Sequence, residues 1–403
     1  MIDAFSIFTL VGLTIFLGYV SSIIFKKTQI PDVIWLLLFG LITGPILNLI
    51  DRTLFVSTAP LLAAFALLII LFDAGLEMNL YSIIKQFPRS ILITIVGVFL
   101  TIIAIAVTSV FLFNFDWIRA FLLGSIICGS SSAIVVSILK KLKIKEDVRV
   151  ILDLESIFTD PIVVVLTIAL IQIYISTLPL YSIIGSIVSA FSIGAVTGFM
   201  AGLIWLILLN KIKNNFDYML TLAILLLIYT FVESIGGSGA FSSLIFGIVL
   251  GSGKIFSKAL KFKKIASLDP SMKKFHEEIT FFVKSFFFVT MGIIVSINSN
   301  FILQGIVIVI VIILTRIAAV FLSTYKMNLT SLEINVMRVV IPHGLAAAVM
   351  AYMPMVYGVK DAEIFLNIAF IVILATIIYT TVAIKYIYSK NKQKETNPSI
   401  KID

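Results

Sequence analysis

Two acidic residues, Glu155 and Asp160, lie in the middle of an apolar segment that is long enough to cross a lipid bilayer. At a rise of about 1.5 Å per residue, Asp160 lies roughly 18 Å from the Val148 end of this segment, close to the bilayer centre. A carboxylate at that depth costs on the order of 3 kcal/mol or more. Because so costly a residue normally faces a water-filled path, its position predicts an ion-coupled transporter.

Hydroxyl groups accompany these two carboxylates on the same helix. Ser156 precedes Asp160 by four residues, and Thr159 follows Glu155 by four, so each pair shares a helix face. Hard oxygen ligands suit a hard cation such as Na⁺ or Li⁺, or a proton. We therefore expect an ion site at Asp160 with Ser156 and Thr159. For Glu155, a buried ion pair that only fixes helix packing is an equally good interpretation.

Glycine and serine interrupt another apolar segment at its centre, in the run Cys128-Gly-Ser-Ser-Ser-Ala133. Glycine loosens a helix, and serine competes for its backbone hydrogen bonds. Such a break is tolerated at membrane depth where it is buried in protein or lines a cavity. We predict a broken helix with Ser130 and Ser131 as candidate ion ligands; a seam of small residues for close helix packing is the alternative.

A second break is predicted in Val340-Ile-Pro-His-Gly-Leu-Ala-Ala-Ala348, because Pro342 removes a helix donor and Gly344 is flexible. The two interrupted segments hold comparable places in two halves of the chain. Paired breaks at matching positions are typical of an inverted repeat whose site lies at the midplane of the membrane.

Asp73, Lys284 and Arg316 are further ionisable residues that fall within apolar segments. Asp73 is deep enough to need a partner or water, and we expect it to line the cytoplasmic approach to the site. Lys284 and Arg316 fit two interpretations, either buried counter-charges or long side chains that reach the membrane interface.

The composition places these segments in a membrane. Hydrophobic residues form 60% of the 403-residue chain and charged residues 13%, which is more apolar surface than soluble cores could bury. We predict an all-α polytopic membrane protein with one transmembrane domain, 1–387, and a cytoplasmic tail, 388–403. The thirteen predicted spans are 5–25, 31–50, 58–79, 90–113, 119–139, 148–175, 181–209, 218–234, 238–253, 277–297, 301–325, 332–356 and 362–387.

Basic residues alternate between the two sets of connections. One set carries 24 of the 30 Lys and Arg residues, whereas the other carries only Arg52, Arg119 and Lys360. By the positive-inside rule the rich set is cytoplasmic, which puts the N-terminus outside and the C-terminus inside. The formal charge of +9 therefore indicates contact with anionic lipid, chiefly through the loop 254–275, and not with nucleic acid.

We expect neither a cofactor nor an enzyme activity. Cys128 is the only cysteine, which excludes an intramolecular disulfide and a multi-cysteine metal site. His276 and His343 are too few and too far apart for a zinc motif. The N-terminus has no cationic leader, so the first apolar run is expected to be a retained span.

Five motifs resemble those of one transporter family, the NhaP-like sodium/proton antiporters of the cation:proton antiporter superfamily. The central one is Glu155-Ser-x-x-Thr-Asp160, which is similar to the family's Glu-Ser-x-x-Asn-Asp. The others are Leu71-Phe-Asp-Ala-Gly-Leu76, Gly236-Gly-Ser-Gly-Ala-Phe241, Gly247-Ile-Val-Leu-Gly251 and Phe286-Phe-Phe-Val-Thr-Met-Gly292.

The resemblance implies a thirteen-helix fold and a homodimer. Spans 1–3 and 8–10 would form a scaffold, and spans 4–6 and 11–13 a mobile core with two crossed, broken helices. Asp160 would bind Na⁺ (or Li⁺) and H⁺ in turn, with Ser156 and Asp73 near the ion. The Ile- and Lys-rich composition suggests a prokaryote, and hence its cell membrane.

The chain departs from the family pattern at three places. Thr159 stands where the family usually has Asn, and Ser130-Ser-Ser132 stands where it has Thr-Asp-Pro, more like the potassium-efflux branch. His343 replaces the arginine of a Pro-Arg-Gly motif, which normally pairs with the counterpart of Glu155. Glu155 must then have another partner, and Arg338 or a protonated His343 are the candidates that would stabilise the core.

One titratable acid beside a neutral Thr159 predicts electroneutral 1:1 exchange, because each half-cycle then carries one positive charge. Exchange of K⁺ for H⁺, or potassium efflux, is the main alternative and is favoured by the serine run. An intramembrane aspartyl protease would need Asp73 and Asp160 to share a proton, and its Tyr-Asp and Gly-x-Gly-Asp patterns are missing. A passive channel would need rings of charges or carbonyls, which are not evident.

Overall fold

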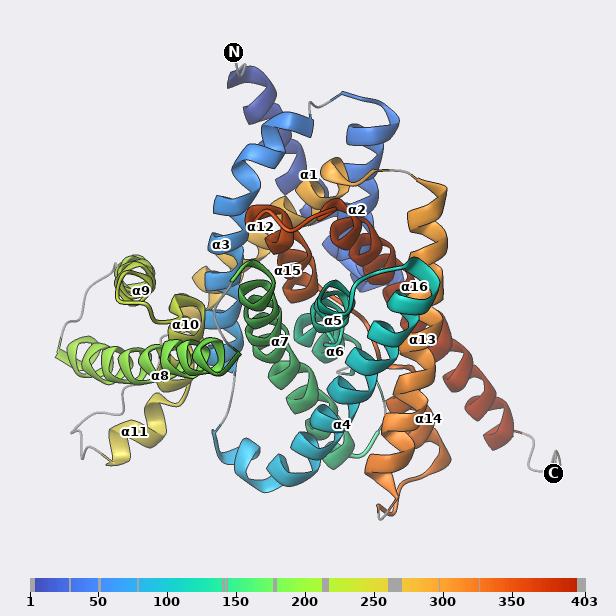
Figure 1. Ribbon diagram of the computed structural model, residues 1–403. Coiled ribbons are helices and arrows are strands. Elements are labelled where there is room, and N and C mark those ends of the chain that lie inside the picture. Colours follow the sequence, from blue (N-terminus) through green and yellow to red (C-terminus); the bar gives the residue numbers. More distant parts are fainter. Residues whose placement is uncertain are drawn as a thin grey trace. The chain divides into compact units, whose positions relative to one another are not determined.

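A computed structural model describes most of the chain. It covers residues 4–28, 30–49, 52–77, 80–139, 142, 144–176, 180–211, 217–259, 270–296, 298–325 and 327–396. Described residues form helices and their connections, without a β-strand among them (Figure 1). The prediction of an all-α protein is confirmed.

Within the described residues, thirteen helical segments correspond to the thirteen predicted spans, and two of these are interrupted. A short helix, α11 (Gly253–Ala259), lies in the connection after the ninth span. The spans are α1 (Ala4–Thr28), α2 (Asp32–Leu41) continued by the π-turn η1 (Ile42–Ile46), α3 (Arg52–Glu77), α4 (Leu80–Phe113), α5 (Trp117–Ile126) with α6 (Ser132–Leu139), α7 (Glu146–Ile175), α8 (Leu180–Lys211), α9 (Asp217–Ser234), α10 (Gly239–Gly251), α12 (Pro270–Ile294), α13 (Ser299–Thr324), α14 (Ser331–Val339) with α15 (Leu345–Val356), and α16 (Glu363–Thr396).

Five described helices are long and apolar enough to cross a bilayer without interruption. Shorter or broken apolar helices account for other predicted spans. The five long segments are Pro88–Phe113, Glu146–Ile175, Val188–Leu209, Ser299–Thr324 and Glu363–Asn391.

The last helix is longer than predicted. We expected the final span to end at 387 and a tail to follow, but α16 continues to Thr396. Its last residues include lysine, glutamine and glutamate, which are good helix formers, so the helix propagates beyond its apolar part. Apolar periodicity finds the part of a helix that is buried in lipid or protein, and it gives no signal for a polar continuation.

The chain divides into two compact units. The first comprises 1–55, 86–174 and 288–403, and the second 56–85 and 175–287. The first unit therefore contains both interrupted spans and α7. The predicted division into scaffold and core spans stays a prediction.

In the first unit, α16 packs against α13, α14 and α15, and α5 packs against α15 (Figure 1). Ile368, Val372 and Ile373 of α16 have no exposed surface, as expected for a helix that is covered on several sides by others. Thr376 and Thr380 on the same helix are also fully buried, and they hydrogen-bond to the backbone at the break between α14 and α15.

An ion-pair cluster lies between the connections at the predicted outer ends of this unit. Arg119 pairs with Asp116 and with Asp361, at 3.0 Å from the latter. Partial burial opposes ionisation of Asp116, but hydrogen bonds from the Arg119 amide and guanidinium outweigh it and lower the pKa of this carboxyl.

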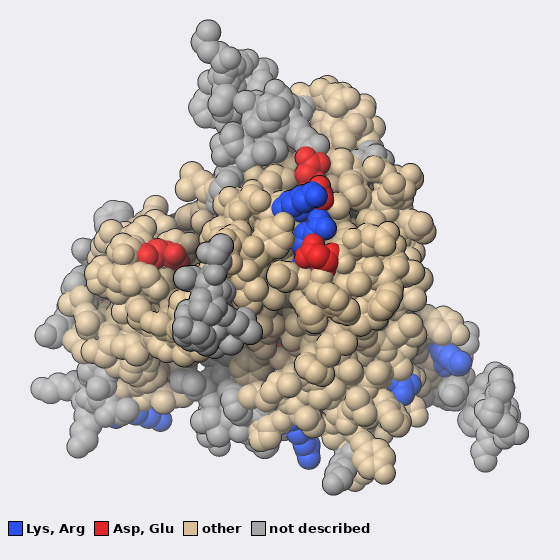
Figure 2. Space-filling view, viewed as in Figure 1, with Lys and Arg blue, Asp and Glu red and all other residues tan. Residues whose placement is uncertain are grey.

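On the face in Figure 2, charged side chains are few and other residues cover most of the surface.

In the second unit, α8, α9 and α10 pack together (Figure 1), and small residues bring α8 close to α10. Gly194, Gly198 and Gly202 follow one another at intervals of four residues on α8. A Cβ atom at Gly198 would lie 2.4 Å from the backbone oxygen of Ser242 on α10. Only glycine permits this contact, which is typical of helix association in membranes.

We expect Gly198→Ala to lower the free energy of unfolding by about 1–3 kcal/mol, because the added methyl group must push two backbones apart. Gly185→Ala on the same helix is the matched control, since a Cβ atom there meets no atom within 4 Å. Thermal or denaturant unfolding of the purified proteins measures both. Equal stability of the two variants would contradict close packing of α8 against α10.

Candidate functional site

The two interrupted spans meet at their breaks. The link between α5 and α6 and the link between α14 and α15 are both irregular, as predicted. The Ser131 amide donates a hydrogen bond of 2.7 Å to the Pro342 carbonyl, which joins one break to the other. A Cβ atom at Gly344 would lie 2.2 Å from the Ser131 hydroxyl oxygen, so glycine is needed for this contact. Freed backbone groups at membrane depth thus find partners in each other.

Asp160 projects from α7 towards the start of α6. Its side chain is buried, and its Oδ2 atom accepts a hydrogen bond of 2.9 Å from the Ser132 hydroxyl. The Ser132 backbone amide also donates to this carboxylate. Ser132 is the first residue of α6, and the N-terminus of a helix favours negative charge. The carboxylate is therefore stabilised by neutral donors, and a proton or a cation can add to it.

Ser132 was missed by the sequence interpretation, which favoured Ser130 and Ser131. In the structure Ser131 contacts the other break, and Ser130 faces Thr159. The serine run marked the right segment. Which of three successive serines faces the acid depends on where the new helix begins, and that position is set by packing at the crossing.

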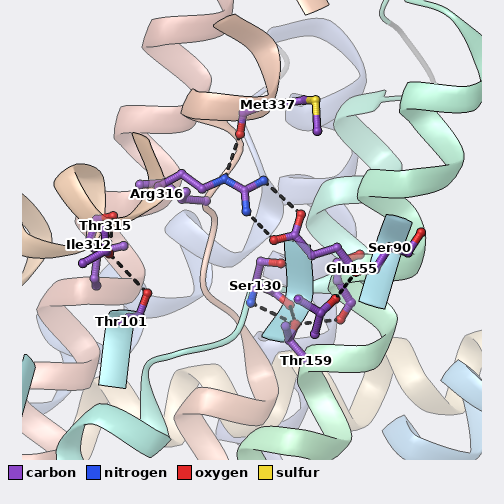
Figure 3. A network of polar contacts seen from close by, with 12 residues as sticks. Ser90, Thr101, Ser130, Glu155, Thr159, Ile312, Thr315, Arg316 and Met337 are labelled. Carbon is purple, nitrogen blue, oxygen red and sulfur yellow. Dashed lines mark hydrogen bonds and ion pairs between the residues drawn. The ribbon is translucent and has the colours of Figure 1, made fainter. Parts of the chain in front are cut away.

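Thr159 connects α7 to the same break. Its hydroxyl oxygen accepts a hydrogen bond of 3.2 Å from the Ser130 amide and also lies 3.2 Å from the Ser130 carbonyl (Figure 3). Ser156 is fully buried, and its hydroxyl donates to the Asp153 carbonyl of its own helix at 2.8 Å. Ser156 and Thr159 thus lie within one turn of Asp160 on α7, but their hydroxyl protons point to backbone carbonyls.

Glu155 forms a buried ion pair with Arg316 of α13 (Figure 3). The contact is bidentate: Arg316 Nη1 contacts Oε1, and Nη2 donates to Oε2 at 3.0 Å. Arg316 Nε also donates to the Met337 carbonyl, at 2.8 Å. The side chains are only 8% and 6% exposed, so neither charge is solvated from the surface.

This pair corrects the expected partners of Glu155, which were Arg338 and His343. Arg338 is half-buried on α14, and its Nε atom has no hydrogen-bond partner among the described residues. His343 hydrogen-bonds to backbone carbonyls instead. Arg316 was recognised only as a possible counter-charge, because nothing in the sequence states which basic residue α13 brings against α7.

A small cavity lies beside the ion pair. It has a volume of about 40 Å³ and is lined by Glu155, Arg316, Thr159, Ser130 and His343, among others. That volume accommodates about one to three water molecules. The cavity walls therefore connect the neutralised acid to the backbone of both broken helices.

Asp73 belongs to the second unit. It is half-buried on α3, two residues after the buried Leu71. Its expected position near the ion bound by Asp160 stays a prediction.

The family model described as "Sodium/hydrogen exchanger, transmembrane" matches residues 12–390. The chain is 30% identical over 316 residues to a probable Na⁺/H⁺ antiporter 2 of Methanocaldococcus jannaschii, covering 71% of either chain. It is 27% identical to the K⁺/H⁺ antiporter NhaP2 of Shewanella sp. strain ANA-3, covering 93% of this chain but only 65% of that relative.

The fold is also similar to a solved structure, that of the sodium proton antiporter MjNhaP1 from Methanocaldococcus jannaschii at pH 8. The TM-score is 0.81 at 20% sequence identity, over 94% of this chain and 97% of the other. At that identity the similarity concerns the fold, and the predicted architecture with two crossed, discontinuous helices is confirmed by it.

We expect Arg316→Met to destabilise the protein by about 3–5 kcal/mol, because it leaves the Glu155 carboxylate buried without a partner. The double variant Glu155→Gln/Arg316→Met should recover most of this loss, since both charges are removed together. The free energies of unfolding of the wild type, Arg316→Met, Glu155→Gln and the double variant form a double-mutant cycle. Additive losses would show that the two side chains do not act as a pair.

Proposed function

Because this chain belongs to the sodium/hydrogen exchanger family, we propose that it is a secondary antiporter that exchanges Na⁺ (or Li⁺) for H⁺ at Asp160. One observation supports this choice of residue. Of the two acids buried on α7, Glu155 has a permanent basic partner, whereas the hydrogen bonds that the described residues provide to Asp160 come from the neutral Ser132. Only Asp160 is left to exchange its counter-charge.

The mechanism is competition at one carboxylate. Ionised Asp160 attracts a cation, and the hydroxyl and carbonyl oxygens of Ser156, Thr159 and the serine run supply further hard ligands. A proton on Asp160 removes the charge that holds the cation, so binding of the two is mutually exclusive. Movement of the broken helices relative to the rest of the chain would then expose the carboxylate to each side in turn.

Exchange of K⁺ for H⁺ is the second candidate. The Shewanella relative is a K⁺/H⁺ antiporter, and so is a relative from Alkalimonas amylolytica, which is 22% identical over 92% of this chain. The chain spans about two thirds of the length of these two relatives. Ser131, in place of the acid in the usual motif, leaves fewer charged ligands, which favours a larger and more weakly hydrated cation.

We also propose an assembly and a topology, from the family resemblance and the distribution of basic residues. We place the protein in the cell membrane as a homodimer, with the N-terminus outside and the C-terminus in the cytoplasm. The asymmetry of basic residues among the connections supports this orientation. No cofactor enters the proposal, since Na⁺ and H⁺ are the transported substrates.

Asp160→Asn should abolish cation-dependent proton movement in proteoliposomes, because an amide neither binds a proton near neutral pH nor carries the negative charge that attracts a cation. The variant should fold, since asparagine can still accept the Ser132 hydrogen bond. Fluorescence of an internal pH dye measures exchange against Na⁺, Li⁺ and K⁺. Exchange at the wild-type rate by Asp160→Asn would remove the residue from the mechanism, and a response to K⁺ alone would favour the second candidate.

Exchange should be electroneutral, with one cation for one proton, because one carboxylate carries one charge in each direction. A voltage-sensitive dye in the same vesicles should therefore report no membrane potential that grows with turnover. Addition of valinomycin in symmetric K⁺ should leave the rate of Na⁺-driven exchange unchanged. A potential proportional to turnover would require a second titratable group in the cycle.

A further inference from the structure

Both ring nitrogens of His343 face backbone carbonyl oxygens. Nε2 lies 2.9 Å from the Ile127 carbonyl, and Nδ1 lies 3.0 Å from the Ile341 carbonyl. A carbonyl oxygen only accepts hydrogen bonds, so each contact needs a proton on the ring nitrogen. A neutral imidazole carries one such proton, and an imidazolium carries two.

A neutral ring therefore lacks one of the two protons that the carbonyls require, and the Thr376 hydroxyl on α16 already has another acceptor. It lies 3.2 Å from Nδ1, but it donates its proton to the Val372 carbonyl at 2.7 Å. It also accepts a hydrogen bond from the His343 amide. A neutral ring with a bare Nδ1 would therefore direct a lone pair at the Ile341 carbonyl, and it could accept the Thr376 proton only at the expense of the bond from Thr376 to Val372. A protonated Nδ1 keeps that bond and satisfies the Ile341 carbonyl.

The two carbonyls mark the ends of the interrupted helices. Ile127 is the residue that caps the C-terminus of α5, and Ile341 follows Val340, which caps the C-terminus of α14. The C-terminus of a helix carries partial negative charge on its free carbonyl groups and favours a cation. His343 lies between two such ends, at the point where the breaks cross.

We infer that His343 is an imidazolium that binds the C-terminal ends of both half-helices and holds the crossing together. It thereby acts as a positioning residue for Asp160, since the break that includes Ile127 also leads to Ser132 at the start of α6. The inference deepens the proposed function, but the charge on the ring does not depend on transport.

Burial opposes this charge, because the ring is only 3% exposed. The charged groups that line the same cavity are Glu155 and Arg316, and these neutralise each other. Cys128 is the other titratable group there. The Thr376 side of the ring contributes a hydroxyl and no charge. What favours the imidazolium is thus the pair of carbonyls and the two helix ends.

The test uses the fact that the chain contains only two histidines. Protein labelled with ¹⁵N-histidine and carrying His276→Asn leaves His343 as the single ring in the spectrum. His276 lies on α12 in the other unit, where it packs against Phe72. At about pH 7 we expect both ring nitrogens of His343 to be protonated, although a free imidazole is mostly neutral there.

A spectrum with one protonated and one bare nitrogen would overturn the inference. If His276→Asn fails to fold, the difference between the spectra of the wild type and His343→Gln gives the same answer. Both measurements are made on the full chain in lipid and require no exchange activity. Failure of the antiporter assay would therefore leave this result intact.

Exchange measurements distinguish charge from shape. His343→Gln keeps a hydrogen-bond donor without a charge, and we expect it to slow exchange by roughly tenfold or more. His343→Lys and His343→Arg retain a positive charge and should restore much of the rate. A glutamine variant as fast as the lysine variant would contradict a role for the charge, and His276→Gln is the matched control that should exchange at the wild-type rate.

Discussion

The cost of burying charge at membrane depth determines how this core is built. Two carboxylates lie five residues apart on α7, and each must be compensated in a medium that solvates neither. Glu155 is compensated by a bidentate arginine from α13. Asp160 receives hydrogen bonds from Ser132. One acid is therefore part of the framework, and the other is the one that we propose changes its charge or its counter-ion during exchange.

The broken helices also leave polar backbone groups that must be compensated within the protein. Each interruption frees amides and carbonyls that lipid cannot satisfy, and the two breaks satisfy each other through Ser131 and Pro342. Gly344 permits the close approach, and His343 contacts the carbonyls at both C-terminal ends. The N-terminal end of α6 then faces Asp160. The N-terminal end of a half-helix, which favours negative charge, thus lies beside the acid, and the C-terminal ends, which favour positive charge, lie beside the imidazole.

Much of the fold and part of the site could be predicted from the chain. Apolar runs located the spans to within a few residues at most ends, and breaker residues located both interruptions, because lipid imposes a length and a composition on every helix. The polar end of α16 was not predicted, since apolar periodicity gives no signal for a polar helix. The depth of Asp160 singled it out as the candidate ion site, and that role stays a proposal. Ser132 was not separated from its two serine neighbours, because the register of α6 depends on the crossing.

The sequence by itself determined the class of protein, the number of spans, the two breaks and the acid between them, since each follows from local hydrophobicity and backbone chemistry. Only the tertiary structure decided which groups meet. Arg316 is 161 residues from Glu155, and Arg338 and His343 were equally plausible partners by type. Ion pairs and ring contacts of this kind depend on how helices distant in the chain are packed. Packing selects one partner from several that local chemistry permits.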